Sequence, residues 1–121
     1  MYRTVWSDIF SPTFGYITYP LSPKFFWLKT NIVRAFYGNK PIIVSELQAE
    51  PWGPEFFRIA GMSSEERAHS MSIKKFAENT AYARSAGFSE VYLWGAEWWY
   101  FLKVRERDPA YWNIAKETIS E

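Results

Sequence analysis

A short run of β-branched residues that ends in a carboxylate is the feature that most constrains this chain. Ile42, Ile43 and Val44 are typical of a strand that is buried on both faces, as in parallel sheets. The run ends at Glu46, so we expect a strand over residues 41–46 with an acid at its C-terminal tip. In α/β barrels the catalytic groups lie at that end of the strands. The alternative is an acidic loop that only keeps the strand end soluble.

Hydrophobic periodicity and capping residues predict strands that alternate with helices along the chain. We expect strands over residues 1–6, 41–46 and 90–94, helices over 23–37, 70–86, 96–104 and 109–119, and loops over 7–21 and 47–69. Helices between strands imply parallel pairing with right-handed crossovers. The 41–46 strand should therefore pair in parallel with the 90–94 strand and have the 1–5 strand on its other side.

Each predicted helix has an apolar face that could build the core. In the first helix this face comprises Phe25, Leu28, Ile32 and Phe36. In the later helices the inward residues are Ile73, Phe76, Ala77, Thr80 and Ala83, followed by Trp112, Ala115 and Ile119. Ser63 and Glu66 have the spacing of a capping box, and Asp108 is placed to cap the last helix.

Composition and charge exclude several classes of function. The net charge is +1, which provides no field to attract nucleic acid or acidic lipid. The chain has no cysteine and one histidine, His69, so thiolate chemistry and a histidine-based zinc site are excluded, and we expect neither metal nor cofactor. No apolar run approaches the roughly 18 residues that span a bilayer. The absence of cysteine is compatible with any cellular compartment.

The aromatic fraction is 21%, and aromatic rings form flat platforms for ligands.

Taken in order, these segments resemble the C-terminal part of a cellulase-like retaining glycoside hydrolase, from the large clan built on the TIM barrel. The seventh strand in that clan reads Lys-Pro-Ile, three apolar or small residues, then Glu, and residues 40–46 match it. The resemblance implies that Glu46 is the nucleophile. It also implies that Tyr2, on the sixth strand, hydrogen-bonds and orients the nucleophile, and that Trp94, on the eighth, forms a floor for the sugar.

The resemblance implies an α/β fold that is a partial (β/α)8 barrel. Residues 1–121 would supply roughly the last three βα units, strands six to eight, of a single barrel domain whose N-terminal half lies elsewhere in a full-length protein. A small self-contained three-stranded α/β domain remains the alternative.

The implied chemistry needs a second carboxyl group. Retaining hydrolysis uses two carboxyl groups about 5–5.5 Å apart, one as nucleophile and one as general acid and base. In the clan the acid follows an asparagine at the end of the fourth strand, whereas here Asn79 precedes Thr80. Glu50 and Glu97 are the nearby candidates, but we expect them to bind sugar hydroxyls. The chain would then be the nucleophile-bearing part of a retaining O-glycoside hydrolase for oligo- or polysaccharides, and inactive alone.

Tryptophans complete the expected substrate-binding set. Trp52, Trp94 and Trp98 are candidate platforms for a pyranose ring, whereas Trp99 is expected in the core. A different class of protein could use the same aromatic residues: a non-catalytic carbohydrate-binding barrel remnant, or a small α/β carbohydrate-binding domain. Such a protein needs no carboxylate pair.

Overall fold

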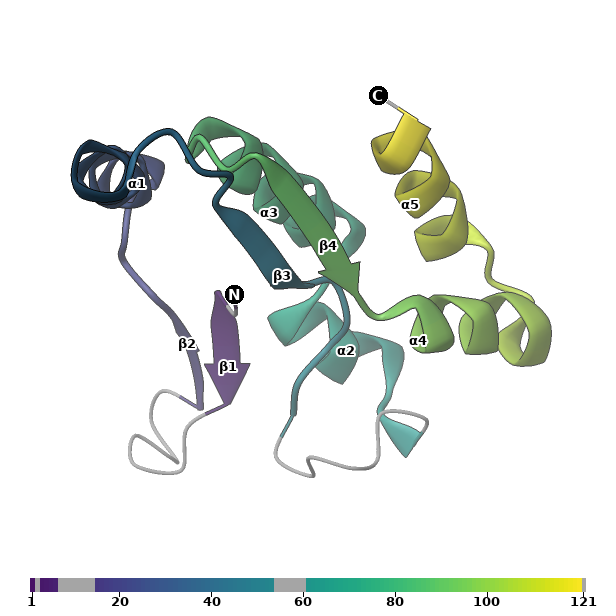
Figure 1. Ribbon diagram of the computed structural model, residues 1–121. Coiled ribbons are helices and arrows are strands. Elements are labelled where there is room, and N and C mark those ends of the chain that lie inside the picture. The colour runs from purple at the N-terminus through teal and green to yellow at the C-terminus, as the bar shows by residue number, and fades with distance from the viewer. Residues whose placement is uncertain (2, 7–14, 54–60, 121) are drawn as a thin grey trace.

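The computed structural model describes residues 1, 3–6, 15–53 and 61–120 of a small α/β protein (Figure 1). Its elements in chain order are β1 (Thr4–Trp6), β2 (Tyr16–Thr18), α1 (Pro23–Tyr37), β3 (Ile43–Gln48), α2 (Ser64–Ser70), α3 (Ile73–Ser85), β4 (Glu90–Trp94), α4 (Ala96–Phe101), a π-helical segment over Leu102–Glu106, and α5 (Ala110–Ser120). No helix in this described part is both long and apolar enough to cross a membrane.

The central pair of strands is β3 and β4, which run side by side in Figure 1. They pair in parallel, with Ile43 opposite Glu90 and Gln48 opposite Trp94, which confirms the predicted pairing. The connection between them contains the helices α2 and α3, as a parallel crossover requires. This sheet has two strands and does not close, so the described residues form no barrel.

The strand β1 differs from its prediction. It pairs antiparallel with β2, with Thr4 opposite Thr18, and β2 lies inside the segment that the sequence predicted to be a loop. The backbone N–H of Gln48 donates to the carbonyl of Met1 at 2.9 Å, so the chain before β1 lies beside the end of β3. The predicted place of the first strand in the β3 sheet is therefore wrong: β1 is near β3, but its strand partner is β2.

A side chain explains why β1 does not join that sheet. The Gln48 carboxamide oxygen accepts hydrogen bonds from the backbone N–H groups of Arg3 (3.0 Å) and Thr4 (3.1 Å). Its Nε2 donates to the Thr4 carbonyl at 2.8 Å. These backbone groups would otherwise pair with a neighbouring strand, and a buried backbone polar group must find a partner. The Gln48 side chain therefore takes the place of a strand ladder.

One face of the β3–β4 sheet is covered by helices. Val44 and Leu47 are buried with Ala83 of α3, and Val91 and Leu93 pack against the same cluster. The predicted core residues Phe76, Ala83, Trp99 and Ala115 are buried, as expected. The predictions for Ile73, Ala77 and Ile119 are wrong, since all three are exposed; Ile73 lies in the first turn of α3 and Ile119 in the last turn of α5. The opposite face of the sheet exposes three large apolar side chains: Ile43, Tyr92 and Trp94.

Capping residues set the helix boundaries. The Ser63 hydroxyl accepts from the Glu66 N–H at 3.1 Å and starts α2, a helix inside the long loop predicted over 47–69. The Ser72 hydroxyl accepts from the Lys75 N–H at 3.2 Å, so α3 begins at Ile73 rather than at residue 70. Each hydroxyl satisfies a backbone donor that the helix itself leaves unpaired. The Asp108 carboxylate accepts from the Ala110 N–H at 3.0 Å at the start of α5, as predicted.

The helix α1 has the predicted bounds but an unexpected orientation. Pro23 is its first residue, and Gly38 ends it at φ 79°, a value that favours glycine. Thr30 is the buried residue of this helix. The four residues of its apolar face are all exposed: Phe25, Leu28, Ile32 and Phe36.

Candidate functional site

A β-bulge places the proposed nucleophile. Val44 is opposite Val91 and Leu47 is opposite Leu93, with an irregularity between the two pairs. Two residues of β3, Ser45 and Glu46, therefore stand against one residue of β4. Strand β3 continues to Gln48, so the expectation that Glu46 ends the strand is wrong by two residues. Bulges commonly lie next to functional sites, where they redirect a side chain.

The bulge decides which face of the sheet Glu46 occupies. In a regular strand, residues two apart share a face, so Glu46 would lie on the helix-covered side with Val44. Val44 and Leu47 both pack against Ala83 of α3, which is possible only because an extra residue sits between them. Glu46 is thereby turned to the opposite face, with exposed Trp94.

The surroundings of Glu46 include the start of the chain. The side chain is partly buried, and its negative charge raises the pKa of the terminal amine of Met1, against a larger lowering caused by burial. This effect requires the Glu46 carboxylate to lie close to Met1. Tyr2, the residue expected to orient Glu46, lies outside the described residues.

The second feature of the site is a tryptophan–carboxylate pair. Trp94 Nε1 donates a hydrogen bond of 2.8 Å to Glu50 Oε1, and the indole is 45% exposed. Burial raises the pKa of the Glu50 carboxyl above its usual range; the hydrogen bond from Trp94 opposes this, and the charge of Glu97 adds to it. Glu50 and Glu97 are thus close enough to interact, and both belong to the same end of the sheet as Trp94.

The backbone fixes the distance between the ends of β3 and β4. The Ala49 N–H donates to the Trp94 carbonyl at 2.9 Å, and Trp99 Nε1 donates to the Ala49 carbonyl at 2.7 Å. Gly95 adopts φ +138°, and a Cβ there would lie 2.9 Å from the Ala49 oxygen. Only glycine permits this close approach. The segment after β3 is therefore held rigidly against the segment after β4.

The other predicted substrate-binding residues have different environments. Trp98 is 5% exposed, and its ring packs edge-on against Tyr111 with centroids 4.4 Å apart, so little of the indole is accessible to a sugar. Trp52 is partly buried, and its backbone N–H donates to the Ser70 hydroxyl at 2.9 Å. Glu97 is exposed in the first turn of α4, where its negative charge interacts favourably with the helix dipole.

Sequence reasoning missed a buried polar network beneath the site. Asn79 of α3 donates from Nδ2 to the Gln48 carbonyl at 3.2 Å and accepts from Arg3 Nη1 at 3.2 Å. The Arg3 guanidinium also lies 4.1 Å from the ring centroid of Tyr82. The detectable signal was a glutamine directly after a buried strand and an asparagine on the inner side of a helix. Buried polar side chains are rare unless they are hydrogen-bonded.

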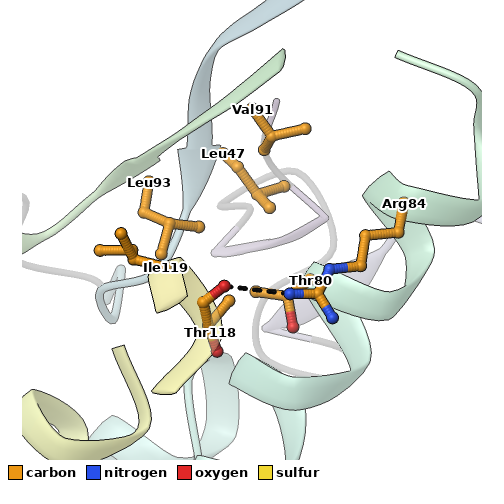
Figure 2. A pocket seen from close by; sticks show the side chains of 7 residues that line it. All are labelled: Leu47, Thr80, Arg84, Val91, Leu93, Thr118 and Ile119. Atoms are coloured by element: carbon orange, nitrogen blue, oxygen red, sulfur yellow. Dashed lines mark hydrogen bonds between the residues drawn. The ribbon is translucent and has the colours of Figure 1, made fainter. Parts of the chain in front are cut away.

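A separate cavity of about 220 Å³ lies between the sheet and the helices α3 and α5 (Figure 2). Its lining combines Leu47, Val91 and Leu93 with residues of both helices, among them Arg84, which donates to the Thr118 carbonyl at 3.0 Å. The cavity is on the helix-covered face, whereas Glu46 and Trp94 are on the other. It is therefore not part of the candidate site.

The described residues contain no group of three or more His, Asp or Glu side chains placed to hold a metal ion. No protein-family model, curated protein or solved structure matches this chain.

Proposed function

We propose that this chain carries the nucleophile and the sugar platform of a retaining O-glycoside hydrolase that acts on an oligo- or polysaccharide. Glu46 is the nucleophile, Trp94 the platform, and Glu50 with Glu97 the groups that bind sugar hydroxyls. The observation that supports this most directly is the β-bulge, which brings Glu46 to the same face of the sheet as Trp94.

The arrangement suits the first half of a retaining mechanism. A carboxylate attacks the anomeric carbon while the sugar ring is held in place, and a covalent glycosyl ester forms. An exposed indole offers an apolar plate to the C–H groups on one face of a pyranose. Its Nε1 is already occupied by Glu50, so the ring plane of Trp94 has a defined orientation before substrate arrives.

The second half of the mechanism needs a protonated carboxyl group. We assign that role to no described residue. The Glu50 carboxylate accepts a hydrogen bond from Trp94, and the Glu97 charge interacts favourably with the helix dipole of α4. The chain by itself is then inactive on substrates with poor leaving groups, which require a general acid.

We further propose that the βα units belong to a (β/α)8 barrel, as its strands six to eight. Parallel β3 and β4 with α3 between them support this, as does the exposed apolar face that carries Ile43, Tyr92 and Trp94. In a barrel that face is covered by the other strands across the interior.

A fluoro-sugar probe with a dinitrophenolate leaving group tests the nucleophile directly. Such a leaving group departs without protonation, so labelling needs the nucleophile and not the acid. Mass spectrometry of peptides should show the label on Glu46, retained in Glu50→Gln and absent in Glu46→Gln. A label on Glu50 or Glu97, or no label on any carboxylate, would count against the proposal.

A non-catalytic carbohydrate-binding protein is the second candidate, favoured by the exposure of Trp94 and its fixed contact with Glu50. Such a protein binds oligosaccharide through Trp94 and is not labelled at Glu46. Calorimetric titration and probe labelling separate the two. In this second case Trp94→Ala abolishes binding, Glu46→Gln still binds, and the probe does not label even the wild-type chain.

A further inference from the structure

The helix α1 presents its apolar side away from the protein. Phe25, Leu28, Ile32 and Phe36 follow one another at intervals of three or four residues and so share one face. Leu28 is 53% exposed and Phe36 is 81% exposed. A surface helix normally turns such a face toward the core.

The opposite side of α1 makes the contacts with the rest of the protein. Phe26 lies near the rings of Tyr82 and Phe88, with centroids 6.2 and 6.0 Å away. Thr30 is buried, and Arg34 Nη2 donates to the Gly87 carbonyl at 3.2 Å. Phe26, Thr30 and Arg34 are spaced by four, so they define one line along the helix, across from the apolar face. The apolar face therefore points away from the described part of the protein, and α1 lies at the left edge of the molecule in Figure 1.

The charges on α1 are all positive. The helix contains Lys24, Lys29 and Arg34 and no acidic residue. At 100° per residue, Lys24 and Lys29 lie on the two edges of the apolar face. The Lys29 ammonium lies 5.4 Å from the ring centroid of Phe25, and no carboxylate of the described residues pairs with either lysine. The net charge of +1 conceals this local concentration.

We propose that α1 docks the protein onto an anionic lipid surface. A helix with Phe and Leu on one face and lysines at its edges lies in the plane of a membrane, with the apolar side chains among the acyl chains and the ammonium groups at the phosphates. At 15 residues the helix is about 22 Å long, too short to span the bilayer.

A second copy of the chain fits this face less well. The two aromatic and two aliphatic side chains of the apolar face expose roughly 400 Å², below the about 800 Å² per partner of a standard interface. Two facing copies would also set lysine edges against lysine edges with no acid to offset them, and like charges across an interface are costly. A surface of lipid phosphates supplies the missing negative charge. The proposal concerns the residues of α1 and none of the candidate site, so its test needs no glycosidase activity.

Vesicle co-sedimentation of the 121-residue chain tests the proposal. The chain should bind phosphatidylcholine vesicles that contain about 30 mol% phosphatidylserine, and bind pure phosphatidylcholine vesicles more weakly. The double variant Leu28→Ser/Phe36→Ser should bind at least about tenfold more weakly. Lys24→Gln and Lys29→Gln should each weaken binding about fivefold, because each basic residue near an anionic surface contributes about 1 kcal/mol.

A matched control comes from exposed apolar residues elsewhere. Tyr100→Ser/Ile119→Ser removes two comparably exposed side chains from α4 and α5 and should leave vesicle binding within about twofold. Circular dichroism of each variant verifies that the helices persist. The proposal would be overturned if the wild-type chain did not bind anionic vesicles. It would also be overturned if the Leu28/Phe36 and Tyr100/Ile119 variants lost vesicle binding to the same extent. A third outcome would also overturn it: the wild-type chain sediments as a dimer, does not bind vesicles, and becomes monomeric only in the Leu28/Phe36 variant. The partner of the α1 face would then be a second copy of the chain and not lipid.

Discussion

Trp94 Nε1 donates a hydrogen bond of 2.8 Å to the Glu50 carboxylate, which joins the last residue of β4 to the segment after β3. The bond stabilises the charged form of Glu50, whereas burial and the charge of Glu97 destabilise it. Removing each influence should move the pKa in a defined direction. Trp94→Phe should raise the pKa of Glu50 further, and Glu97→Gln should lower it.

Carbon-detected NMR titration of the side-chain carboxyl groups measures both changes. Glu90→Gln is a suitable control, because Glu90 is at the other end of β4 and should leave the Glu50 titration unchanged. If Trp94→Phe lowered the pKa of Glu50, the hydrogen bond would not be present in solution.

The raised pKa of Glu50 has a consequence for stability. The folded protein holds this proton more tightly than the unfolded chain, so stability falls as the pH rises from the ordinary pKa of 4.5 through the higher folded value. Glu50→Gln has no charge to bury and should therefore be more stable than the wild type at neutral pH. The gain should be a fraction of a kcal/mol, since the group is half exposed and solvent screens it.

Urea denaturation at two pH values measures this difference. The advantage of Glu50→Gln should be present near pH 7 and disappear near pH 4, where both proteins carry a neutral side chain. An advantage that grew on acidification would show that Glu50 is stabilised in its charged form.

The Gln48 side chain should be essential for holding β1. Gln48→Leu leaves the N–H groups of Arg3 and Thr4 without their acceptor in a buried setting. Each unsatisfied buried group is costly, so we expect a loss of about 2–4 kcal/mol in the free energy of unfolding.

Ser45→Ala, an exposed change in the same strand, provides the comparison and should alter stability by less than about 0.5 kcal/mol. Hydrogen exchange should show the Thr4 amide losing protection in Gln48→Leu. Retained protection there would mean that another group holds β1.

Two glycines with positive φ should respond differently to alanine. Gly95→Ala would place its Cβ 2.9 Å from the Ala49 carbonyl oxygen, which the β3–β4 pairing holds in place. At Gly38, with φ +79°, no atom of the described residues beyond its two chain neighbours lies within 4 Å of the position that an added Cβ would take, so alanine there meets only backbone strain. Such strain costs about 1–3 kcal/mol.

Gly95→Ala should therefore lose at least about 1 kcal/mol more than Gly38→Ala in urea denaturation, because a steric clash adds to the strain. It should also weaken probe labelling of Glu46, since the ends of β3 and β4 are pushed apart. Equal losses in the two variants would indicate that Ala49 moves freely.

Local sequence signals determined where most of the regular elements lie, with β2 and α2 as the exceptions. The β-branched run at 42–44 and the motif at 90–94 each became a strand, and the parallel pairing followed from the helix between them. Serine, aspartate and proline at helix starts, and Gly38 at a helix end, marked boundaries to within a few residues. These signals are strong because capping and backbone geometry depend on neighbours in the chain.

Nonlocal contacts decided the site. An extra residue in β3 cannot be recognised without knowing that Val44 and Leu47 pack against the same helix, so the sequence placed Glu46 at a strand tip instead of in a bulge. In the same way, Trp98 and Trp94 look equivalent as aromatic residues. Tertiary packing buried one against Tyr111 and left the other exposed.

The sequence by itself determined the apolar face of α1, the strand that carries Glu46 and the order of the remaining elements, but not β2 and α2. Only the tertiary structure decided that the apolar face of α1 points outward and that Gln48 replaces a strand partner for β1. The physical reason is that periodicity identifies which residues share a face, whereas the direction of that face depends on which distant segments bury more surface and satisfy more polar groups.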